Sequence, residues 1–146
     1  MYEQLKLENQ LCFRLYAVSR LITQAYKPLL MSLGITYPQY LVLLVLWEKD
    51  RQPVNDIAKR LILNTNTVTP LLQRMESEGI VKRSKNKEDA RKVIVSLTEM
   101  GKSMEKKAAS IPMDIVNTFS CENLNAESGG EMMKTLDEFI QILNKE

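Results

Sequence analysis

Four side chains in the first part of the chain have the types and spacing for thiol chemistry. Cys12 is followed one helical turn later by Tyr16, and Tyr26 and Tyr37 lie further along. A thiolate attacks peroxides, and its first product is a sulfenic acid. A phenol hydroxyl that donates a hydrogen bond to a thiolate favours this charged, nucleophilic form. The alternative is that Cys12 is a small buried hydrophobic residue among aromatic neighbours.

A long helix must position these groups, and its geometry limits how they can meet. Apolar residues recur at spacings of three and four from Leu11 to Leu29, which predicts one face of an amphipathic helix. In such a helix Cys12 and Tyr26 share a face to within roughly 40° but lie about 21 Å apart along the axis. Without a sharp bend they cannot meet within one chain, whereas an antiparallel helix pair in a symmetric dimer can bring them together.

A second thiol, Cys121, lies in the C-terminal part of the chain. It is a candidate resolving thiol for Cys12 or a partly buried residue near a loop, and the sequence favours neither interpretation. The N-terminus lacks the basic start and apolar middle of a signal peptide, and no apolar run approaches the ~20 residues that a membrane span needs. We therefore expect a cytoplasmic protein without a membrane partner or a permanent structural disulfide.

Composition narrows the class of protein further. Histidine is absent, which removes the usual catalytic base and the usual metal ligand. We therefore expect no enzyme activity, no metal and no cofactor. The chain has 146 residues, of which 45% are hydrophobic, so it is long enough for one well-packed domain and short for two.

The middle of the chain predicts a winged helix-turn-helix. Ile57, Ala58 and Leu61 indicate a short supporting helix, and a second apolar face runs from Val68 to Met75. Gly79 follows where a helix commonly ends in a left-handed residue, and a charged hairpin comes next. This order of elements docks on duplex DNA. Pro70 leaves the start of the second helix open: Asn64 as the cap predicts a kink, whereas Asn66 or Thr67 puts Pro70 near the first turn.

The second helix of this module carries a polar front that suits a major groove. Its short hydrogen-bonding groups are of the kind that contact phosphates and base edges. The alternative is a solvated face beside helix caps, and the position between a supporting helix and a basic hairpin favours DNA. The candidate DNA-contacting residues on this helix are Asn64, Thr65, Asn66, Thr67, Thr69, Gln73 and Arg74.

The hairpin concentrates the positive charge of the chain. The whole chain has a net charge of +2, whereas residues 80–92 carry net +4. Strands are predicted over 80–83 and 92–97, joined by a loop over 84–91. At its tip Arg91 can enter a narrow minor groove while Asp89 holds its guanidinium, although an ordinary surface ion pair is the alternative. The candidate DNA contacts in the hairpin are Ser84, Lys85, Lys87, Asp89 and Arg91.

The remaining segments complete the predicted architecture. Gly34 ends the first helix, Pro38 suits the first turn of the next, and residues 49–53 form a polar loop. A helix from Thr98 runs at least to Ser110, and Pro112 can bend it. Residues 123–130 are the most loop-like stretch of the last third, and a final amphipathic helix covers 132–143. The apolar stripes of the terminal helices exceed what this small module can cover, so we infer pairing with a second copy. We expect a mainly α fold with a small β wing (α+β), with the winged module over about 37–98 and dimerisation helices over about 1–34 and 99–146.

Several segments resemble the MarR family of dimeric winged-helix regulators. They are LENQLCFRLY around Cys12, ITYPQY around Tyr37, TVTPLLQRME before Gly79 and EDARKVIVSLT in the hairpin. Within that family they are most similar to the organic hydroperoxide resistance repressors. The resemblance implies a homodimer on a palindromic operator, which represses a peroxidase gene until an organic hydroperoxide oxidises Cys12. It also implies that two tyrosines of the partner subunit hydrogen-bond the reactive cysteine, and these match Tyr26 and Tyr37.

The route that follows oxidation stays open at the level of sequence. Some family members form a mixed disulfide between the reactive cysteine and a small thiol, and others form an intersubunit disulfide with a C-terminal cysteine. Cys121 lies only near that second position. The alternatives for function are a regulator switched by a small aromatic or acidic ligand and a broader redox-tuned global regulator. A thiol peroxidase is a third alternative, disfavoured by the scarcity of catalytic groups.

Overall fold

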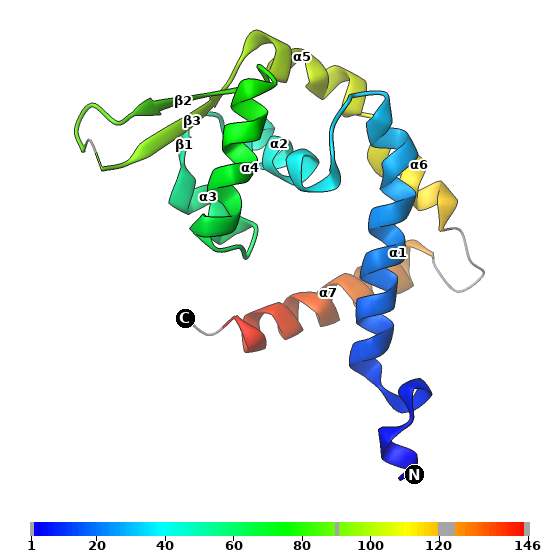
Figure 1. Ribbon diagram of the computed structural model, residues 1–146. Coiled ribbons are helices and arrows are strands. Elements are labelled where there is room, and N and C mark those ends of the chain that lie inside the picture. The colour runs from blue at the N-terminus through cyan, green and yellow to red at the C-terminus, as the bar shows by residue number, and fades with distance from the viewer. Residues whose placement is uncertain (1, 90, 120–124, 145–146) are drawn as a thin grey trace. The chain divides into compact units, whose positions relative to one another are not determined.

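The computed structural model of the chain describes residues 2–89, 91–119 and 125–144. It contains two compact units, Met1–Ile111 and Pro112–Glu146. Helices dominate, and one small antiparallel sheet lies in the first unit, which confirms the expected mainly α fold with a β wing (Figure 1). The division into one winged module with dimerisation helices on both sides stays a prediction. No helix within the described residues is long and apolar enough to cross a membrane.

The first unit begins with two short 3₁₀ turns, η1 (Glu3–Leu5) and η2 (Leu7–Asn9), and the long helix α1 (Leu11–Met31). Gly34 has φ +68°, which confirms that a left-handed residue follows the helix. Helix α2 (Tyr37–Glu48) starts with Thr36 as its cap, Pro38 in the first turn and a capping box that Gln39 completes. The expected boundary between these two helices is confirmed.

The helix-turn-helix consists of α3 (Val54–Arg60) and α4 (Thr65–Ser77). Asn64 is the cap of α4, so Pro70 lies inside the helix, beyond its tolerated first turn. Gly79 has φ +74° and ends this helix, as its position predicts. In Figure 1, α4 lies beside the hairpin, and α3 lies at the lower end of α4.

The sheet has the order β1-β3-β2, with β1 (Gln52–Pro53), β2 (Val81–Lys85) and β3 (Val93–Leu97). The hairpin strands are antiparallel, with Val81 opposite Leu97 and Lys85 opposite Val93. The prediction of an unpaired polar loop over 49–53 is wrong at its end, because Gln52 and Pro53 pair with β3. A proline is tolerated there because β1 is an edge strand, where a missing N–H leaves no ladder bond unmade.

The core of the first unit lies around α2, which is buried on most of its faces. Apolar side chains from α2, α3, α4 and the sheet meet there: Val42, Leu43, Leu46, Ile57, Val68, Leu72, Met75 and Val95. This packing fixes α3 and α4 against each other and holds the hairpin beside α4.

Helix α5 (Glu99–Ala108) is capped by Thr98, whose hydroxyl oxygen accepts a hydrogen bond from the Gly101 N–H at 3.1 Å. The predicted extension to Ser110 is wrong, because α5 ends at Ala108 and α6 (Ile111–Thr118) follows. Pro112 explains the break: it has no N–H for the Ala108 carbonyl four residues before it, and its ring would clash there.

The second unit contains most of α6 and the helix α7 (Ala126–Leu143). The final amphipathic helix is thus confirmed, but the loop predicted over 123–130 is wrong from Ala126 onward. Asn125 caps α7 by accepting from the N–H groups of Glu127 and Ser128, which stabilises a first turn that the sequence had made look irregular. Cys121 lies outside the described residues, so its role as a resolving thiol stays a prediction.

Candidate nucleic-acid interface and cysteine site

Helix α4 separates its apolar and polar residues cleanly. Val68, Leu72 and Met75 are fully buried against the core. The polar front faces solvent, with Thr69 half-buried at its edge and these residues exposed: Asn64, Thr65, Asn66, Thr67, Gln73 and Arg74. Burial of the opposite face fixes the rotation of α4, so this polar face is the one that it can present to a partner.

A groove of about 320 Å³ lies between α3, α4 and the hairpin. Thr65 and Thr69 of α4 line one side, and Arg91 and Lys92 of the hairpin line another. The groove therefore brings the polar front of α4 and the predicted wing onto one continuous surface. A helix and a hairpin in this arrangement can address adjacent grooves of one duplex.

Local hydrogen bonds hold the hairpin loop in a defined shape. The Asn86 side-chain oxygen accepts from the N–H of Glu88 at 2.7 Å and from the N–H of Asp89 at 3.3 Å. The Asn86 N–H donates to the Lys92 carbonyl at 2.8 Å, and the Lys92 N–H donates to the Asp89 carbonyl at 2.9 Å. These bonds form a turn at the end of the strands. The loop is therefore built to hold its tip in place.

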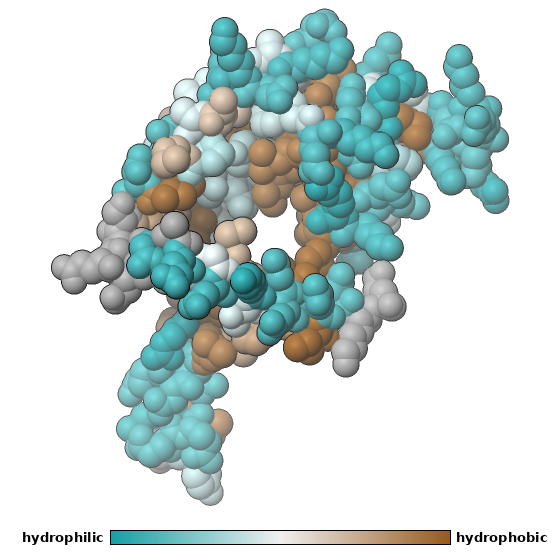
Figure 2. All heavy atoms as spheres, turned by 180° about the vertical axis from the view of Figure 1, so that it is seen from behind, coloured by the Kyte–Doolittle hydropathy of each residue, from teal (hydrophilic) through white to brown (hydrophobic). Residues whose placement is uncertain are grey.

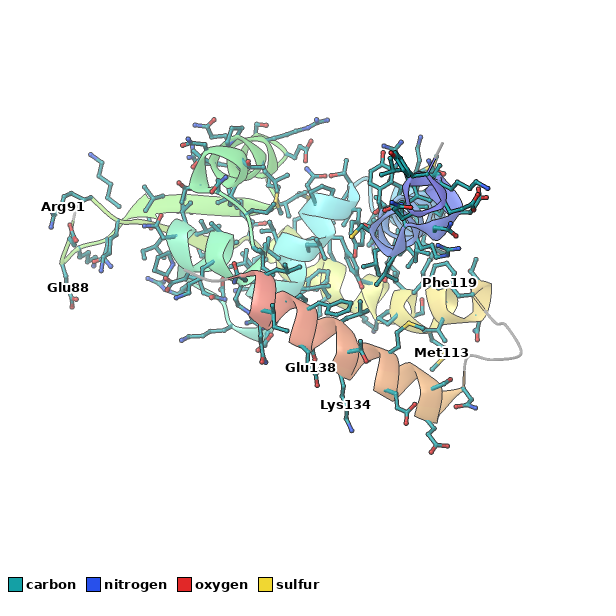
Figure 3. The ribbon with its side chains drawn as sticks, turned by 90° about the horizontal axis from the view of Figure 1, so that it is seen from below. Glu88, Arg91, Met113, Phe119, Lys134 and Glu138 are labelled. Atoms are coloured by element: carbon teal, nitrogen blue, oxygen red, sulfur yellow. The ribbon has the colours of Figure 1, made fainter. Side chains whose placement is uncertain are left out.

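Asp89 orients Arg91 at that tip. One Asp89 carboxylate oxygen accepts from the Arg91 N–H and from the Arg91 Nε, both at 3.1 Å. The Arg91 side chain is 92% exposed, whereas the Asp89 side chain is 30% exposed. The side-chain and backbone hydrogen bonds from Arg91 hold the pKa of the Asp89 carboxyl below its usual value. Figure 3 shows Arg91 and Glu88 at the far end of the hairpin, which leaves the guanidinium free to reach a ligand.

Arg83 has a different role from the other basic residues of the hairpin. Its guanidinium contacts the Glu76 carboxylate at 2.8 and 2.9 Å, and its backbone N–H donates to the same carboxylate at 2.9 Å. The backbone and side-chain hydrogen bonds from Arg83 lower the pKa of Glu76. This pair ties β2 to α4, so Arg83 fixes the wing in place.

Besides Arg91, the hairpin presents four lysines to solvent. Lys82, Lys85, Lys87 and Lys92 are all exposed. The hairpin lies at the upper right of Figure 2 and shows an almost wholly hydrophilic surface. A hydrogen-bonded, basic, solvent-facing hairpin beside a polar helix has the charge and shape that phosphate backbones select.

Cys12 is the second residue of α1, and it is exposed. Tyr16 lies one turn on, where its hydroxyl accepts from Arg20 at 3.2 Å and its ring lies 5.6 Å from the Arg20 guanidinium. Pro28 lies beyond Tyr26 in the helix, and residues 13–25 contain neither proline nor glycine. The separation of about 21 Å between Cys12 and Tyr26 along an uninterrupted helix therefore holds.

Tyr26 and Tyr37 meet at the other end of α1. Their ring centroids are 4.7 Å apart, and Tyr40 packs against both at 5.8 and 6.4 Å. Burial raises the pKa of all three phenols, and the neighbouring tyrosine rings raise that of Tyr26 and Tyr40 further. The phenols therefore keep their protons at neutral pH, as hydrogen-bond donors must. The structure brings the two predicted sensor tyrosines together and leaves Cys12 of the same chain far from them.

Comparison with known proteins assigns the family. Residues 24–108 match the family model described as transcriptional regulator SarA/Rot. The organic hydroperoxide resistance transcriptional regulator of Bacillus subtilis is 44% identical over 142 residues, which cover 97% of this chain and 92% of the relative. The structure of reduced AbfR bound to DNA, a Staphylococcus epidermidis protein, has a TM-score of 0.80 at 37% identity and covers 98% of both chains. The chain belongs to the MarR family of winged-helix transcriptional regulators.

Two further similarities bear on this MarR-family chain. The regulator MgrA of Staphylococcus aureus is 30% identical over 146 residues, covering 99% of this chain and 97% of the relative. AbfR is also known in an overoxidized form bound to DNA and in a disulfide form. The similarities within the family include a regulator named for organic hydroperoxide resistance and one whose structures record several oxidation states.

Sequence reasoning missed the residues that join the parts of this MarR-family fold. Tyr40 completes the tyrosine cluster, and the Trp47 indole N–H donates to the Gly101 carbonyl at 2.9 Å. The side chains of Gln39 and Glu76 also form hydrogen bonds to other elements, Gln39 to Glu78 and Glu76 to Arg83. The signals available were the polar Gln39 inside an apolar run and the spacing of the aromatic residues in α2. Neither signal reveals its partner, because each partner lies far away in the sequence.

Proposed function

We propose that this MarR-family protein is a DNA-binding transcriptional repressor that releases its operator when an organic hydroperoxide oxidises Cys12. The proposal rests on the positions of the thiol and the two phenols at opposite ends of α1. An exposed thiol lies at one end, and two protonated phenols lie at the other, on the same chain as a complete winged helix-turn-helix. The redox forms and DNA complexes of AbfR support the same function.

DNA binding follows from the polar front of α4 and the hairpin. We infer that α4 enters the major groove with Thr67 and Gln73 toward base edges, and that Arg91 enters the adjacent minor groove. The exposed hairpin lysines neutralise phosphates, so the affinity falls steeply as salt rises. A homodimer places two such modules on a palindromic operator, because the symmetry of the protein and that of the site match.

The sensor is completed by a second copy of the chain. Leu11, Leu15 and Val18 are exposed on α1, although apolar residues at this spacing belong in an interface. An antiparallel pair of α1 helices covers them and brings Cys12 of one subunit to the Tyr26 and Tyr37 hydroxyls of the other. Hydrogen bonds from those hydroxyls favour the thiolate.

The redox step is a two-electron oxidation of sulfur. The Cys12 thiolate attacks the terminal oxygen of the hydroperoxide, the S–O bond forms and the O–O bond breaks. The alkoxide leaves and takes a proton to become an alcohol, while Cys12 becomes a sulfenic acid. A thiol then condenses with the sulfenic acid to give a disulfide and water. That thiol is either a small cellular thiol or Cys121 of the partner subunit.

An apolar groove beside Tyr37 suits the hydrocarbon part of such an oxidant. It has a volume of about 360 Å³ and is lined largely by apolar surface from α1 and the start of α2, including Leu30, Met31, Ile35 and Pro38. An alkyl or aryl hydroperoxide can bury carbon there, whereas hydrogen peroxide cannot. Organic hydroperoxides should therefore oxidise Cys12 at lower doses than hydrogen peroxide does.

A DNA-release assay tests the proposed function. Fluorescence anisotropy of a labelled operator duplex is measured before and after one equivalent of cumene hydroperoxide, for wild type and for Cys12→Ser. Wild type should release the duplex, and Cys12→Ser should bind with the same affinity but keep the duplex after treatment. Release by Cys12→Ser at the same dose would remove Cys12 from the mechanism.

A further inference from the structure

The start of α2 is hydrogen-bonded directly to the end of the recognition helix α4. The Gln39 side-chain oxygen accepts from the Thr36 N–H at 2.8 Å and from the Thr36 hydroxyl at 3.2 Å. The Gln39 side-chain amide donates to the Glu78 carboxylate at 2.6 Å, across 39 residues of sequence. The other Glu78 oxygen accepts from Arg74 Nε at 3.1 Å. Four side chains thus form one chain of hydrogen bonds from α2 to α4.

The orientation of the Gln39 amide is fixed by its two neighbours. The Thr36 N–H can only donate, so it must face the amide oxygen, and the Glu78 carboxylate can only accept, so it must face the NH₂ group. Gln39 is 2% exposed, and a buried amide without partners is costly. Flipping the amide would place its NH₂ group against the Thr36 N–H and its oxygen against the carboxylate, and separating the two helices would leave the NH₂ group without its carboxylate partner, so the link favours one arrangement.

Glu78 lies at a position that the helix itself disfavours. It is the C-terminal cap of α4, where the negative end of the helix dipole opposes a carboxylate. Its side chain remains 34% exposed, and its hydrogen bonds to Gln39 and Arg74 offset the unfavourable position. A hydrogen bond to a charged group is stronger than one between neutral groups, so this contact can hold α2 and α4 in register.

The link begins beside a proposed sensor residue. Tyr37 lies in the first turn of α2, between Thr36 and Gln39, and its ring packs on Tyr26. A displacement of the Tyr37 ring can be relieved by a movement of the backbone of that turn. Such a backbone movement must either carry Gln39 and the end of α4 with it or break the hydrogen bond to Glu78.

We propose that Gln39 is a positioning residue that transmits the state of the tyrosine sensor to the recognition helix through Glu78. This inference rests on the proposed function, because it concerns how oxidation of Cys12 reaches α4. In the reduced protein the intact link holds α4 in the orientation that fits the operator. Movement of Tyr37 after Cys12 oxidation shifts the start of α2, and the link passes that shift to α4.

A double-mutant cycle on operator affinity isolates this hydrogen bond. Gln39→Met keeps the bulk of the side chain but also loses the capping box, whereas Glu78→Ala also releases Arg74. The two variants share only the lost bond between Gln39 and Glu78, so their shared, non-additive effect belongs to that bond. Thr36→Val is the matched control, because it removes a contact to Gln39 and leaves the bond to Glu78.

For each variant three quantities are measured on the full-length dimer: the rate of Cys12 oxidation by mass spectrometry, and the operator affinities of the reduced and the oxidised protein. The oxidation rate should match wild type in all variants. The ratio of reduced to oxidised affinity should fall at least about fivefold in Gln39→Met and in Glu78→Ala, the lower end of typical allosteric coupling. In the double variant this ratio should be no lower than in either single variant, and Thr36→Val should keep the wild-type ratio.

The outcomes separate this inference from the function on which it rests. Wild-type ratios in both single variants, additive effects in the double variant, or an equal loss of affinity in both redox states would overturn the role of Gln39 while leaving the Cys12 switch intact. A wild-type protein that is oxidised at Cys12 and still holds the operator would overturn the proposed function, and the inference with it.

Discussion

Helices α1 and α2 follow each other in the sequence but differ in how far their leucine side chains are buried. Leu43 and Leu46 of α2 are fully buried within their own chain, whereas Leu11 and Leu15 of α1 are 59% and 40% exposed. The winged module therefore completes its core within one subunit, whereas the N-terminal part of α1 leaves its apolar residues exposed. The comparison shows that the winged module packs its core inside the subunit, while the proposed thiol sensor needs a second copy.

Leucine truncations on the two helices should have opposite consequences. Leu43→Ala should lower the free energy of unfolding by about 2–5 kcal/mol, because it opens a cavity in a packed core. Leu15→Ala should change subunit unfolding by less than about 0.5 kcal/mol but weaken dimerisation. Urea unfolding at low protein concentration and sedimentation equilibrium measure the two effects. If Leu15→Ala strongly destabilised the subunit and left the dimerisation affinity unchanged, the proposed difference between α1 and α2 would be wrong.

A glycine on α5 tests how tightly the winged module is packed. A Cβ at Gly101 would lie 2.3 Å from the Ile80 carbonyl oxygen, which belongs to the backbone and cannot turn aside. Gly101→Ala should therefore destabilise the protein by about 1–3 kcal/mol. Gly130 of α7 is the control, since a Cβ there has no described heavy atom within 4 Å. A lower melting temperature for Gly130→Ala than for Gly101→Ala would contradict this account of the packing.

Arg91→Ala tests whether the hairpin acts in DNA binding apart from dimerisation. It should weaken operator binding by about tenfold, which is the loss of one minor-groove contact. The dimer should stay intact, because the hairpin tip lies far from α1. Anisotropy titrations at physiological salt and size-exclusion chromatography measure the two properties. Full affinity without the Arg91 guanidinium would exclude the hairpin tip from recognition.

The Glu76–Arg83 pair gives a pH dependence that belongs to the winged module alone. Arg83 lowers the pKa of Glu76 in the folded state, so the pair stabilises the fold above the ordinary glutamate pKa, and this stabilisation is lost as pH falls through the lowered value. The stability difference between wild type and Glu76→Gln should therefore be constant near neutral pH and shrink in acid. Urea unfolding from neutral pH into acid measures this stability difference. A difference that grew in acid would show that Arg83 does not stabilise the ionised form of Glu76.

The sequence predicts those parts of the fold that depend on local patterns. The period of the apolar residues in α1, the glycines after α1 and α4, and the alternating strands of the hairpin all signal their structures within a few residues. The pairing of Gln52 and Pro53 with β3 and the early end of α5 were missed, because they depend on a distant strand and on the backbone around Pro112. Within the site, spacing suggests Tyr26, Tyr37 and the Asp89–Arg91 pair. The hydrogen bonds between Gln39 and Glu78 and between Glu76 and Arg83 could not be predicted, since the sequence around a polar residue does not identify its partner in a distant segment.

Each sensor is proposed to take its thiol from one subunit and its phenols from the other, and mixed dimers test this arrangement most directly. Cys12→Ser homodimers have no reactive thiol, and Tyr26→Phe/Tyr37→Phe homodimers should be oxidised slowly because the thiolate loses its donors. A heterodimer of these two chains, purified through two different tags, contains one Cys12 that faces intact tyrosines only if the site crosses the interface. Under one equivalent of organic hydroperoxide, that Cys12 should be oxidised as fast as in wild type. A heterodimer as slow as the double tyrosine variant would contradict the cross-subunit sensor.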